Sequence, residues 1–366
     1  MFTGRSLLLF RKNLQAWFAQ FQRDLPWRIN KDPYRIWISE IMLQQTRVAA
    51  VIPYYERFLE HFPNIQALAK APQEEVLRLW SGLGYYSRAR NLQKTAQQIV
   101  AQHDGIFPST HTDVLALSGI GNYTAAAILS IAHGKKHAVL DGNVARVLAR
   151  LGAIHGDLRA NGRWHQLQKM ADDLLDPHEP GDWNQAMMEL GATICMPRSP
   201  QCLLCPVNQW CEARKQGVVA CIPEKRNKRA TEEITLATLV FVDAKGNSLL
   251  LAPPKTLSKS KVHANVAALL SRLWHFPTIE VHKDAAKELK SYVQENFLRG
   301  KTFAPALKPL KKVRHTVTYR SITILPFRAD VVTLPRLPNS RIIPLADIST
   351  VAISNLTRKV ARSALG

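Results

Sequence analysis

Two different hydrophobic patterns divide the chain. In the first 212 residues, apolar residues recur at i, i+3 and i+4 spacing, which is the period of an amphipathic helix. This pattern predicts helices over 36–50, 73–101, 112–133 and 143–151. From about residue 234 onward the pattern predicts strands over 234–242, 248–251 and 321–327, and one helix over about 284–298. We therefore predict a mainly α fold, with a helical domain followed by a smaller α+β domain.

A polar segment separates the two patterns. It includes the basic run Lys225-Arg226-Asn227-Lys228-Arg229 and has the composition of a solvated connector. A length of 366 residues suggests about two domains, since a domain typically has about 150 residues. We place the domains at 1–212 and 234–366, with a basic linker at 213–233.

The charge of the chain points to a polyanionic partner. There are 49 Lys and Arg residues against 28 Asp and Glu residues, which gives a net charge of +21. Nucleic acid is the commonest polyanion, although charge alone leaves a membrane surface or an RNA-rich assembly open. A hydrophobic share of 46% excludes a disordered or collagen-like chain.

The first residues raise the question of a targeting segment. No carboxylate precedes Asp24, and Arg5, Arg11 and Lys12 make the segment basic, as in a transit peptide. Its apolar residues nevertheless recur at near-helical spacing, so we predict the first helix of the folded domain. No apolar run approaches the ~18 residues that span a bilayer. We expect a bacterial cytoplasmic protein.

Four of the five cysteines form a tight cluster. Their spacing is Cys195-x6-Cys202-x2-Cys205-x5-Cys211, whereas Cys221 stands apart. Four clustered thiols in an intracellular chain indicate metal ligation, by zinc or by an iron–sulfur cluster. Zinc sites usually have two short Cys pairs, and this chain has only one.

Two helical patterns meet at a very short glycine turn. Gly119 and Gly121 permit positive φ angles and leave backbone N–H groups free at the start of the second helix, which is a typical phosphate site. Asp141 follows at another predicted helix start, where the simplest interpretation is an N-cap.

Glu40 lies in a predicted helix with mostly apolar neighbours. Ile36, Trp37, Leu43 and Gln44 are three or four residues away and share its helix face. A carboxyl group on such a face is expected to have a raised pKa and to be able to act as a general acid.

Together these features resemble the helix–hairpin–helix DNA glycosylase superfamily, and most closely its adenine DNA glycosylase (MutY) family, across almost the whole chain. The matching strings are Asp24-Leu-Pro-Trp-Arg28, Ser39-Glu40-Ile-Met-Leu-Gln-Gln-Thr-Arg47, Gly82-Leu-Gly-Tyr85-Tyr-Ser-Arg88, Gly119-Ile-Gly-Asn-Tyr-Thr-Ala125, Leu140-Asp-Gly-Asn143 and the four-cysteine pattern. The resemblance implies one four-iron, four-sulfur cluster on these cysteines, in a module at about 186–212.

The resemblance also implies a base excision repair reaction. Protonated Glu40 would donate a proton to N7 of a flipped adenine, and ionised Asp141 would stabilise the resulting sugar cation, leaving an abasic site. Tyr123 and Asn143 would support this centre by hydrogen bonds. Strand-cleaving relatives carry a lysine at the position of Tyr123, so a monofunctional glycosylase is expected.

The same resemblance implies a monomeric enzyme whose partner is duplex DNA that carries adenine opposite 8-oxoguanine or guanine. It also implies roles for further residues. The residues implied to line the adenine pocket are Arg23, Leu25, Trp27 and Gln185. Gln45, Thr46 and Tyr85 would enter the duplex near the lesion, and Arg198 would contact a phosphate.

The second domain resembles the Nudix-like, lesion-recognition domain of the family. It lacks a Nudix box, so pyrophosphatase activity is not expected. The lesion-reading loop usually runs His-Thr-Phe-Ser-His, and here it runs His315-Thr316-Val317-Thr318-Tyr319. Thr318 keeps a hydroxyl and Tyr319 keeps a donor, whereas Val317 loses an aromatic surface.

Two other functions remain open at this point. One is a related glycosylase that removes another base, such as mismatched thymine. The other is a catalytically silent iron–sulfur DNA-binding protein. Glu40 and Asp141 argue against the silent protein, because a binding module needs neither carboxylate.

Overall fold

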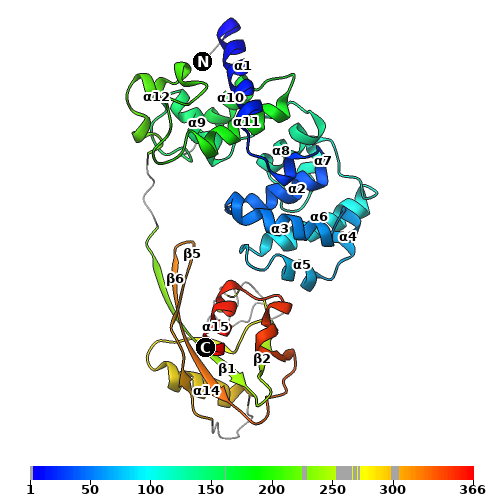
Figure 1. Cartoon of the computed structure of the whole chain (residues 1–366), viewed down its shortest axis with the longest axis vertical. Helices are drawn as coiled ribbons and strands as arrows, with labels where there is room; N and C mark the ends of the chain where they lie inside the picture. Colours follow the sequence, from blue (N-terminus) through cyan, green and yellow to red (C-terminus); the bar gives the residue numbers. More distant parts are fainter. Residues whose placement is uncertain are drawn as a thin grey trace. The chain divides into compact units, whose positions relative to one another are not determined.

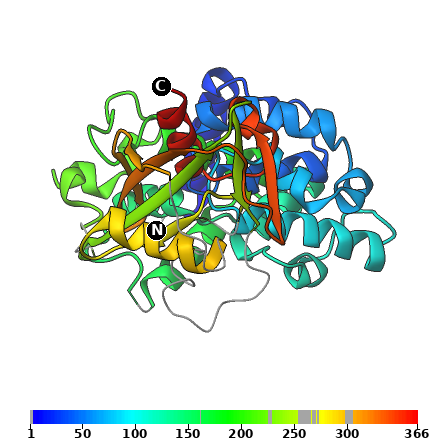
Figure 2. The ribbon, with the colours of Figure 1, turned by 90° about the horizontal axis from the view of Figure 1, so that it is seen from below.

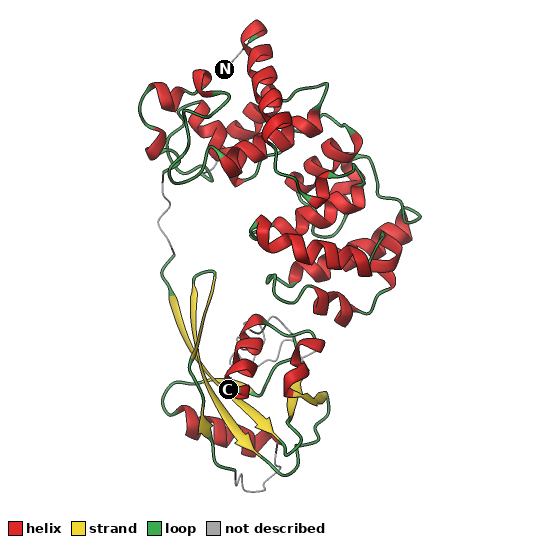
Figure 3. Cartoon of the chain, in the orientation of Figure 1, coloured by secondary structure: helices red, strands yellow, loops and turns green. Residues whose placement is uncertain are grey.

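The computed structural model of the chain describes residues 3–160, 162–224, 229–252, 266, 270, 273–297 and 305–366 (Figure 1). Its contacts divide the chain into two compact units. One contains residues 1–70 and 91–227, and the other contains residues 71–90 and 228–366. Helices form the first unit, and all described strands belong to the second (Figure 3). These contents confirm a helical part followed by an α+β part. Residues 225–228 of the expected basic linker lie outside the described residues.

The first unit is a set of helices and short 3-10 turns. They are α1 (Gly4–Phe21), η1 (Pro26–Arg28), α2 (Pro33–Leu43), α3 (Val48–His61), α4 (Ile65–Lys70), most of α6 (Ser87–Gln102), α7 (His111–Ala116), α8 (Asn122–His133), α9 (Gly142–Leu151), α10 (Arg163–Leu174), α11 (Pro180–Thr193), η2 (Asn208–Trp210), α12 (Glu212–Lys215) and η3 (Val219–Cys221). In the described part of the chain, no helix is both long and apolar enough to cross a membrane.

Three of the segments predicted as helices are interrupted in the structure, and one of them, 112–133, divides into α7 and α8 at the predicted glycine turn. The segment 73–101 forms α5 (Gln73–Leu79) and α6, which are separated by a loop in which Gly82, Gly84 and Tyr85 have positive φ angles. Such angles end a right-handed helix. The segment 36–50 is similarly interrupted after α2, where Gln45 has a φ of +59°.

Helix α8 lies at the centre of the first unit. Most of its residues are buried, and it packs against α2, α7 and α11. Helix α11 also packs against α9, and Gly191 permits this close approach because a Cβ atom there would lie 2.8 Å from Cβ of Asn143. The beginning of α9 and one face of α11 are thereby held next to α8.

The second unit contains one larger sheet, a two-stranded sheet and several helices. Its elements are α5, β1 (Glu232–Val242), β2 (Asn247–Leu251), β3 (Thr278–Glu280), α14 (Ala285–Phe297), β4 (Lys308–Pro309), β5 (Val313–Val317), β6 (Arg320–Asp330), β7 (Ser340–Pro344), η4 (Leu345–Thr350) and α15 (Asn355–Leu365). In the larger sheet the strand order is β3-β1-β6-β4, with β5 paired to β6. Strands β1 and β6 are parallel, whereas β5 and β6 form an antiparallel hairpin.

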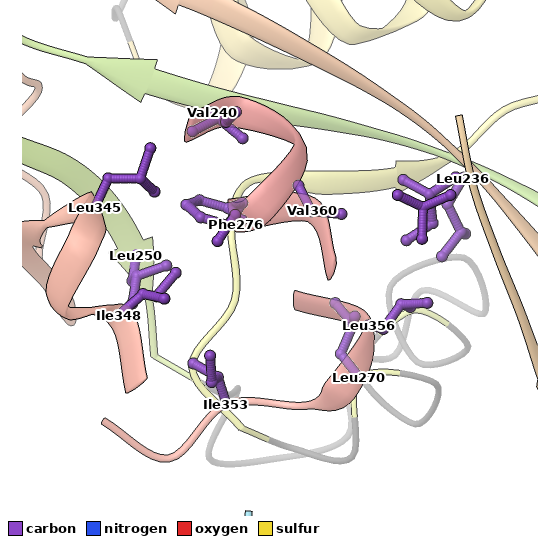
Figure 4. Close-up of a cluster of buried hydrophobic side chains, with 14 of the residues drawn as sticks. Leu236, Val240, Leu250, Leu270, Phe276, Leu345, Ile348, Ile353, Leu356 and Val360 are labelled. Carbon is purple, nitrogen blue, oxygen red and sulfur yellow. The ribbon is translucent and has the colours of Figure 1, made fainter. Parts of the chain in front are cut away.

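Strand β1 separates two hydrophobic cores. Successive side chains point to opposite faces of a strand, and β1 follows this alternation. Leu236 and Val240 pack in the core that contains α15 (Figure 4), whereas Leu239 and Phe241 pack in the core that contains α14. Figure 2 shows the two helices on opposite sides of the sheet. This two-sided burial explains the nearly continuous apolar sequence that predicts this strand.

We expect the α14 core to be required for the stability of the second unit. Leu289 of α14 is fully buried, so Leu289→Ala should lower the free energy of unfolding by about 2–5 kcal/mol. Lys290→Ala on the exposed side of the same helix is the matched control and should change it by less than about 0.5 kcal/mol. Urea denaturation followed by circular dichroism measures both, and equal midpoints for the two variants would contradict this packing.

Candidate active site

A cavity of about 780 Å³ opens in the first unit. Its walls come from η1, α2, the turn after α2, the first residues of α8 and α9, and α11. A volume between about 300 and 1,000 Å³ is typical of ligand pockets. The predicted site residues that line this cavity are Arg23, Leu25, Trp27, Glu40, Gln45, Thr46, Tyr123, Asp141, Asn143 and Gln185.

Glu40 projects into this cavity from the interior of α2. Only 6% of the residue is exposed, because the apolar face predicted from the sequence packs against α8. Burial, with a smaller contribution from the nearby Asp141 carboxylate, raises the pKa of Glu40 to about 7. A hydrogen bond from Tyr123 opposes this rise. The raised pKa predicted for Glu40 is confirmed, and near neutral pH this carboxyl group is able to donate a proton.

Tyr123 connects the second helix of the hairpin to Glu40. Its hydroxyl lies 2.7 Å from Oε2 of Glu40, to which it donates, and 3.2 Å from Sδ of Met188. Burial and the neighbouring carboxylates hold the pKa of Tyr123 well above its usual range, so the phenol keeps its proton. Tyr123 therefore acts as a neutral donor that fixes one oxygen of Glu40.

Asp141 is the N-cap of α9 and also lines the cavity. Its Oδ1 accepts hydrogen bonds from the backbone N–H groups of Asn143 and Val144, at 2.9 and 2.7 Å. Its Oδ2 accepts one from the Asn143 side chain at 3.2 Å. Burial raises the pKa of Asp141 above its usual range, although these hydrogen bonds and the charge of Arg146 act in the opposite direction. The simple N-cap interpretation is correct, and it coexists with a place in the cavity.

Arg146 links Asn143 to the cysteine-rich loop. Its guanidinium donates to Oδ1 of Asn143 at 3.0 Å and to the carbonyl oxygens of Gly191 and Cys195, both at 2.8 Å. The Asn143 amide is therefore oriented by a group that is itself anchored to the first cysteine of the cluster. This connection was not predicted from the sequence.

A buried ion pair forms another wall of the cavity. Glu189 on α11 is 1% exposed and accepts two bonds from the Arg23 guanidinium, at 2.6 and 2.9 Å. Arg28 donates to the same carboxylate at 2.8 Å. The Arg23 and Arg28 hydrogen bonds outweigh burial and lower the pKa of Glu189, which therefore stays ionised. Sequence reasoning missed Glu189 and Arg28, although Glu189 lies four residues after Gln185 on the same helix face.

The hairpin between α7 and α8 has the predicted glycine turn, with one difference. Gly119 has a φ of +78°, and a Cβ atom there would lie 2.9 Å from Asn91. Gly121 is the N-cap of α8 with a φ of −105°, so it does not use the positive φ that glycine permits. A Cβ atom at Gly121 would meet nothing within 4 Å, which leaves the backbone open to approach from outside.

The four clustered cysteines line one small cavity together with Arg150 and Arg214. Arg150 donates to Sγ of Cys195 at 3.3 Å. Burial raises the pKa of Cys205 to about 12, and the other three thiols contribute to this rise because they lie nearby. Among the described residues no group of three or more His, Cys, Asp or Glu side chains is arranged to hold a metal ion, and the four thiols line the small cavity. Thiolates with adjacent cationic donors are the ligand set of an iron–sulfur cluster.

Four predicted residues outside the cavity lie on exposed or partly exposed loops. Arg198 is exposed between Cys195 and Cys202. In the second unit Tyr85 is 41% exposed, and Thr318 and Tyr319 form the turn of the β5–β6 hairpin. The Tyr319 ring is stacked against the Arg229 guanidinium, whose central carbon lies 3.8 Å from the ring centre.

Comparison with known proteins connects this geometry to a family. Residues 38–172 match the HhH-GPD superfamily of base excision DNA repair proteins, and residues 195–211 match the iron–sulfur binding domain of endonuclease III. The second match begins and ends at the outer cysteines of the cluster, so Cys195, Cys202, Cys205 and Cys211 hold a four-iron, four-sulfur cluster.

Individual relatives and a solved structure match different shares of the chain. The adenine DNA glycosylase of Homo sapiens is 36% identical over 413 residues, which cover 96% of this chain and 73% of the human protein. That of Buchnera aphidicola subsp. Acyrthosiphon pisum is 44% identical over 222 residues, covering 60% of this chain and 63% of the relative. A solved structure of a thermostable thymine-DNA glycosylase aligns with a TM-score of 0.53 and 30% identity, over 57% of this chain and 97% of its own.

The cysteine assignment predicts a selective loss of iron. Cys202→Ala removes one thiolate ligand and should release most of the bound iron and the visible absorbance of the cluster. Cys221 is exposed and lies outside the cluster, so Cys221→Ala is the matched control and should keep both. Iron analysis of the two purified variants measures the difference, and full iron in Cys202→Ala would overturn the ligand set.

Proposed function

The chain belongs to the adenine DNA glycosylase family, and on this basis we propose that it excises adenine paired with 8-oxoguanine or guanine in duplex DNA. The observation that carries this proposal is the buried Glu40 carboxyl, hydrogen-bonded to Tyr123 in the cavity that Asp141 also lines. A carboxyl group with a raised pKa and a hydrogen-bonded carboxylate are the two groups that glycosidic hydrolysis requires.

The reaction begins with the adenine rotated out of the duplex into the cavity, at a cost of a few kcal/mol in stacking and pairing. Glu40 donates its proton to N7 of the base. The glycosidic C–N bond then breaks, and its electron pair leaves with the neutral adenine. The sugar becomes an oxocarbenium-like cation, which the Asp141 carboxylate stabilises. Water adds to the sugar carbon and loses a proton, which leaves an abasic site.

Tyr123 determines where the reaction stops. Strand-cleaving relatives of the superfamily use an amine to form a Schiff base with the sugar. A phenol cannot form this adduct, and the Tyr123 hydroxyl already donates a hydrogen bond to Glu40. We therefore infer a monofunctional glycosylase whose product strand stays intact until it is treated with alkali.

The rest of the chain supports a duplex DNA partner. The net charge of +21 favours phosphate binding, and Gly121 leaves the N-terminus of α8 open, where free amides favour an anion. When bound, the iron–sulfur cluster would cross-link residues 195–211, and Arg198 lies on an exposed loop within this segment. We propose a monomeric enzyme of the bacterial cytoplasm, with the second unit as its lesion-recognition domain.

Labelled duplexes test this function directly. Adenine is placed opposite 8-oxoguanine, guanine or thymine, and a further duplex carries thymine opposite guanine; each reaction is analysed with and without hot alkali. We expect alkali-dependent cleavage only at adenine opposite 8-oxoguanine or guanine. Cleavage at thymine would support a thymine glycosylase, and binding without base release would support a silent DNA-binding protein. Cleavage without alkali would contradict the role of Tyr123.

The role of Glu40 can be tested by substitution. Glu40→Gln cannot donate the proton, so the single-turnover excision rate should fall by at least about 10²-fold. Glu60→Gln removes an exposed carboxylate of α3 and is the matched control, with a rate equal to the native protein. An unchanged rate in Glu40→Gln would exclude this residue as the acid.

The pH dependence of excision should depend on Tyr123. The pKa of Glu40 is about 7, so the rate should decrease as pH rises through 7 and the carboxyl group loses its proton. Tyr123→Phe removes a hydrogen bond that favours the ionised form. The pKa of Glu40 should then rise, and the decrease should move to higher pH. A decrease that stays in place or moves to lower pH in single-turnover profiles would contradict the proposed hydrogen bond.

A further inference from the structure

The loop between α5 and α6 holds an exposed aromatic side chain in an unusual conformation. We call residues 80–86 the Tyr85 loop. Gly82 and Gly84 have φ angles of +120° and +73°, and Tyr85 itself has a φ of +47°. A left-handed conformation is unfavourable for a bulky residue, so surrounding contacts have to maintain it. Tyr85 is nevertheless 41% exposed.

Contacts within the loop account for part of this conformation. The Trp80 indole donates to the carbonyl oxygen of Gly84 at 3.1 Å. Arg88 lies against both the Trp80 and Tyr85 rings and donates to the same Gly84 oxygen at 3.3 Å. These contacts fix the segment next to Tyr85. The beginning of the loop is held by other residues.

Those partners come from the C-terminal end of the chain. The carbonyl oxygen of Ile353 accepts two hydrogen bonds, from the Ser81 hydroxyl at 2.8 Å and from the Tyr86 hydroxyl at 3.1 Å. Ser81 and Tyr86 are 6% and 3% exposed, so these bonds are shielded from water. A single backbone oxygen thus holds residues on both sides of Tyr85.

The first turn of α15 adds two side-chain donors. The Asn355 amide donates to the carbonyl oxygen of Gly82 at 3.0 Å, and the Arg358 guanidinium donates to the Ser81 hydroxyl at 2.9 Å. The Ser354 side chain caps this helix and fixes its start. Both donors therefore extend from a rigid element of the second unit.

A separate ion pair fixes the helix before the loop. Glu74 of α5 receives two hydrogen bonds from Arg341 of β7, at 2.6 and 3.2 Å, and Arg341 also stacks on Trp274. The loop is thus attached to the C-terminal part of its own unit at the preceding helix and at its two ends.

We propose that Asn355 and Arg358 are positioning residues for Tyr85, through which the C-terminal α+β domain holds this aromatic side chain ready to stack on a base of lesion DNA. The proposal rests on the proposed function. Stacking of a base on an aromatic ring contributes more to DNA affinity when the ring is already in position, because binding then loses less conformational entropy. The two residues act on DNA through the Tyr85 loop and do not contact it.

A double-mutant cycle separates this role from direct DNA contact and from general stability. The probe is a duplex with 2′-fluoro-2′-deoxyadenosine opposite 8-oxoguanine, in which the fluorine disfavours the sugar cation and prevents excision. Asn355→Ala and Arg358→Met should each weaken binding about three- to tenfold, the effect of one lost hydrogen bond. In a Tyr85→Ala background neither substitution should weaken binding further.

Two further measures show whether a loss of affinity comes from the Tyr85 loop or from another cause. Arg362→Met removes an exposed charge from the same helix and should leave binding unchanged. Asn355→Ala removes only one hydrogen bond and carries the test if Arg358→Met does not fold. Equal losses of affinity in the native and Tyr85→Ala backgrounds, or no loss in Asn355→Ala, would overturn the positioning role. The probe is not cleaved, so these binding results do not depend on excision. A failure to release adenine from the ordinary duplex would refute the proposed function but would leave the positioning role unaffected.

Discussion

The chemistry of the site depends on one buried carboxyl group. Glu40 is inside α2 with almost no access to water, and burial disfavours its charged form. The hydrogen bond from Tyr123 acts in the opposite direction, and together they place its pKa at about 7. A fully exposed carboxyl group would be ionised at neutral pH and unable to protonate a base. The balance between burial and the groups next to Glu40, with the Tyr123 hydrogen bond the largest opposing one, therefore determines whether the group functions as an acid.

The surrounding fold maintains this balance by rigid connections. Tyr123 and Asp141 lie at the starts of α8 and α9, and the backbone N–H groups of α9 hold the Asp141 carboxylate. Asn143 is oriented by Arg146, which is anchored to the carbonyl oxygen of Cys195. The cysteine-rich loop is thus part of the support of the site. Through this connection the loop that holds the cluster has a structural role in the site.

The sequence predicted the parts of the site that depend on local periodicity. The burial of Glu40 followed from its neighbours at three and four residues, and the cap role of Asp141 followed from the glycine after it. The pairing of Glu189 with Arg23 joins residues more than 160 positions apart, which no local pattern reveals. The break in the predicted helix 73–101 was missed because the apolar spacing continues through Leu83 and Tyr86. The Tyr86 hydroxyl donates to the carbonyl oxygen of Ile353, which is distant in sequence.

Infrared difference spectroscopy of Glu40 tests the central claim most directly. Spectra of the native protein and Glu40→Gln are recorded across a pH titration, and their difference isolates the carbonyl stretch of the protonated Glu40 carboxyl group. We predict that this band persists at neutral pH and disappears with a midpoint near pH 7. A midpoint near the ordinary glutamate pKa of about 4.3 would show that Glu40 is ionised at neutral pH, and would contradict its role as the proton donor.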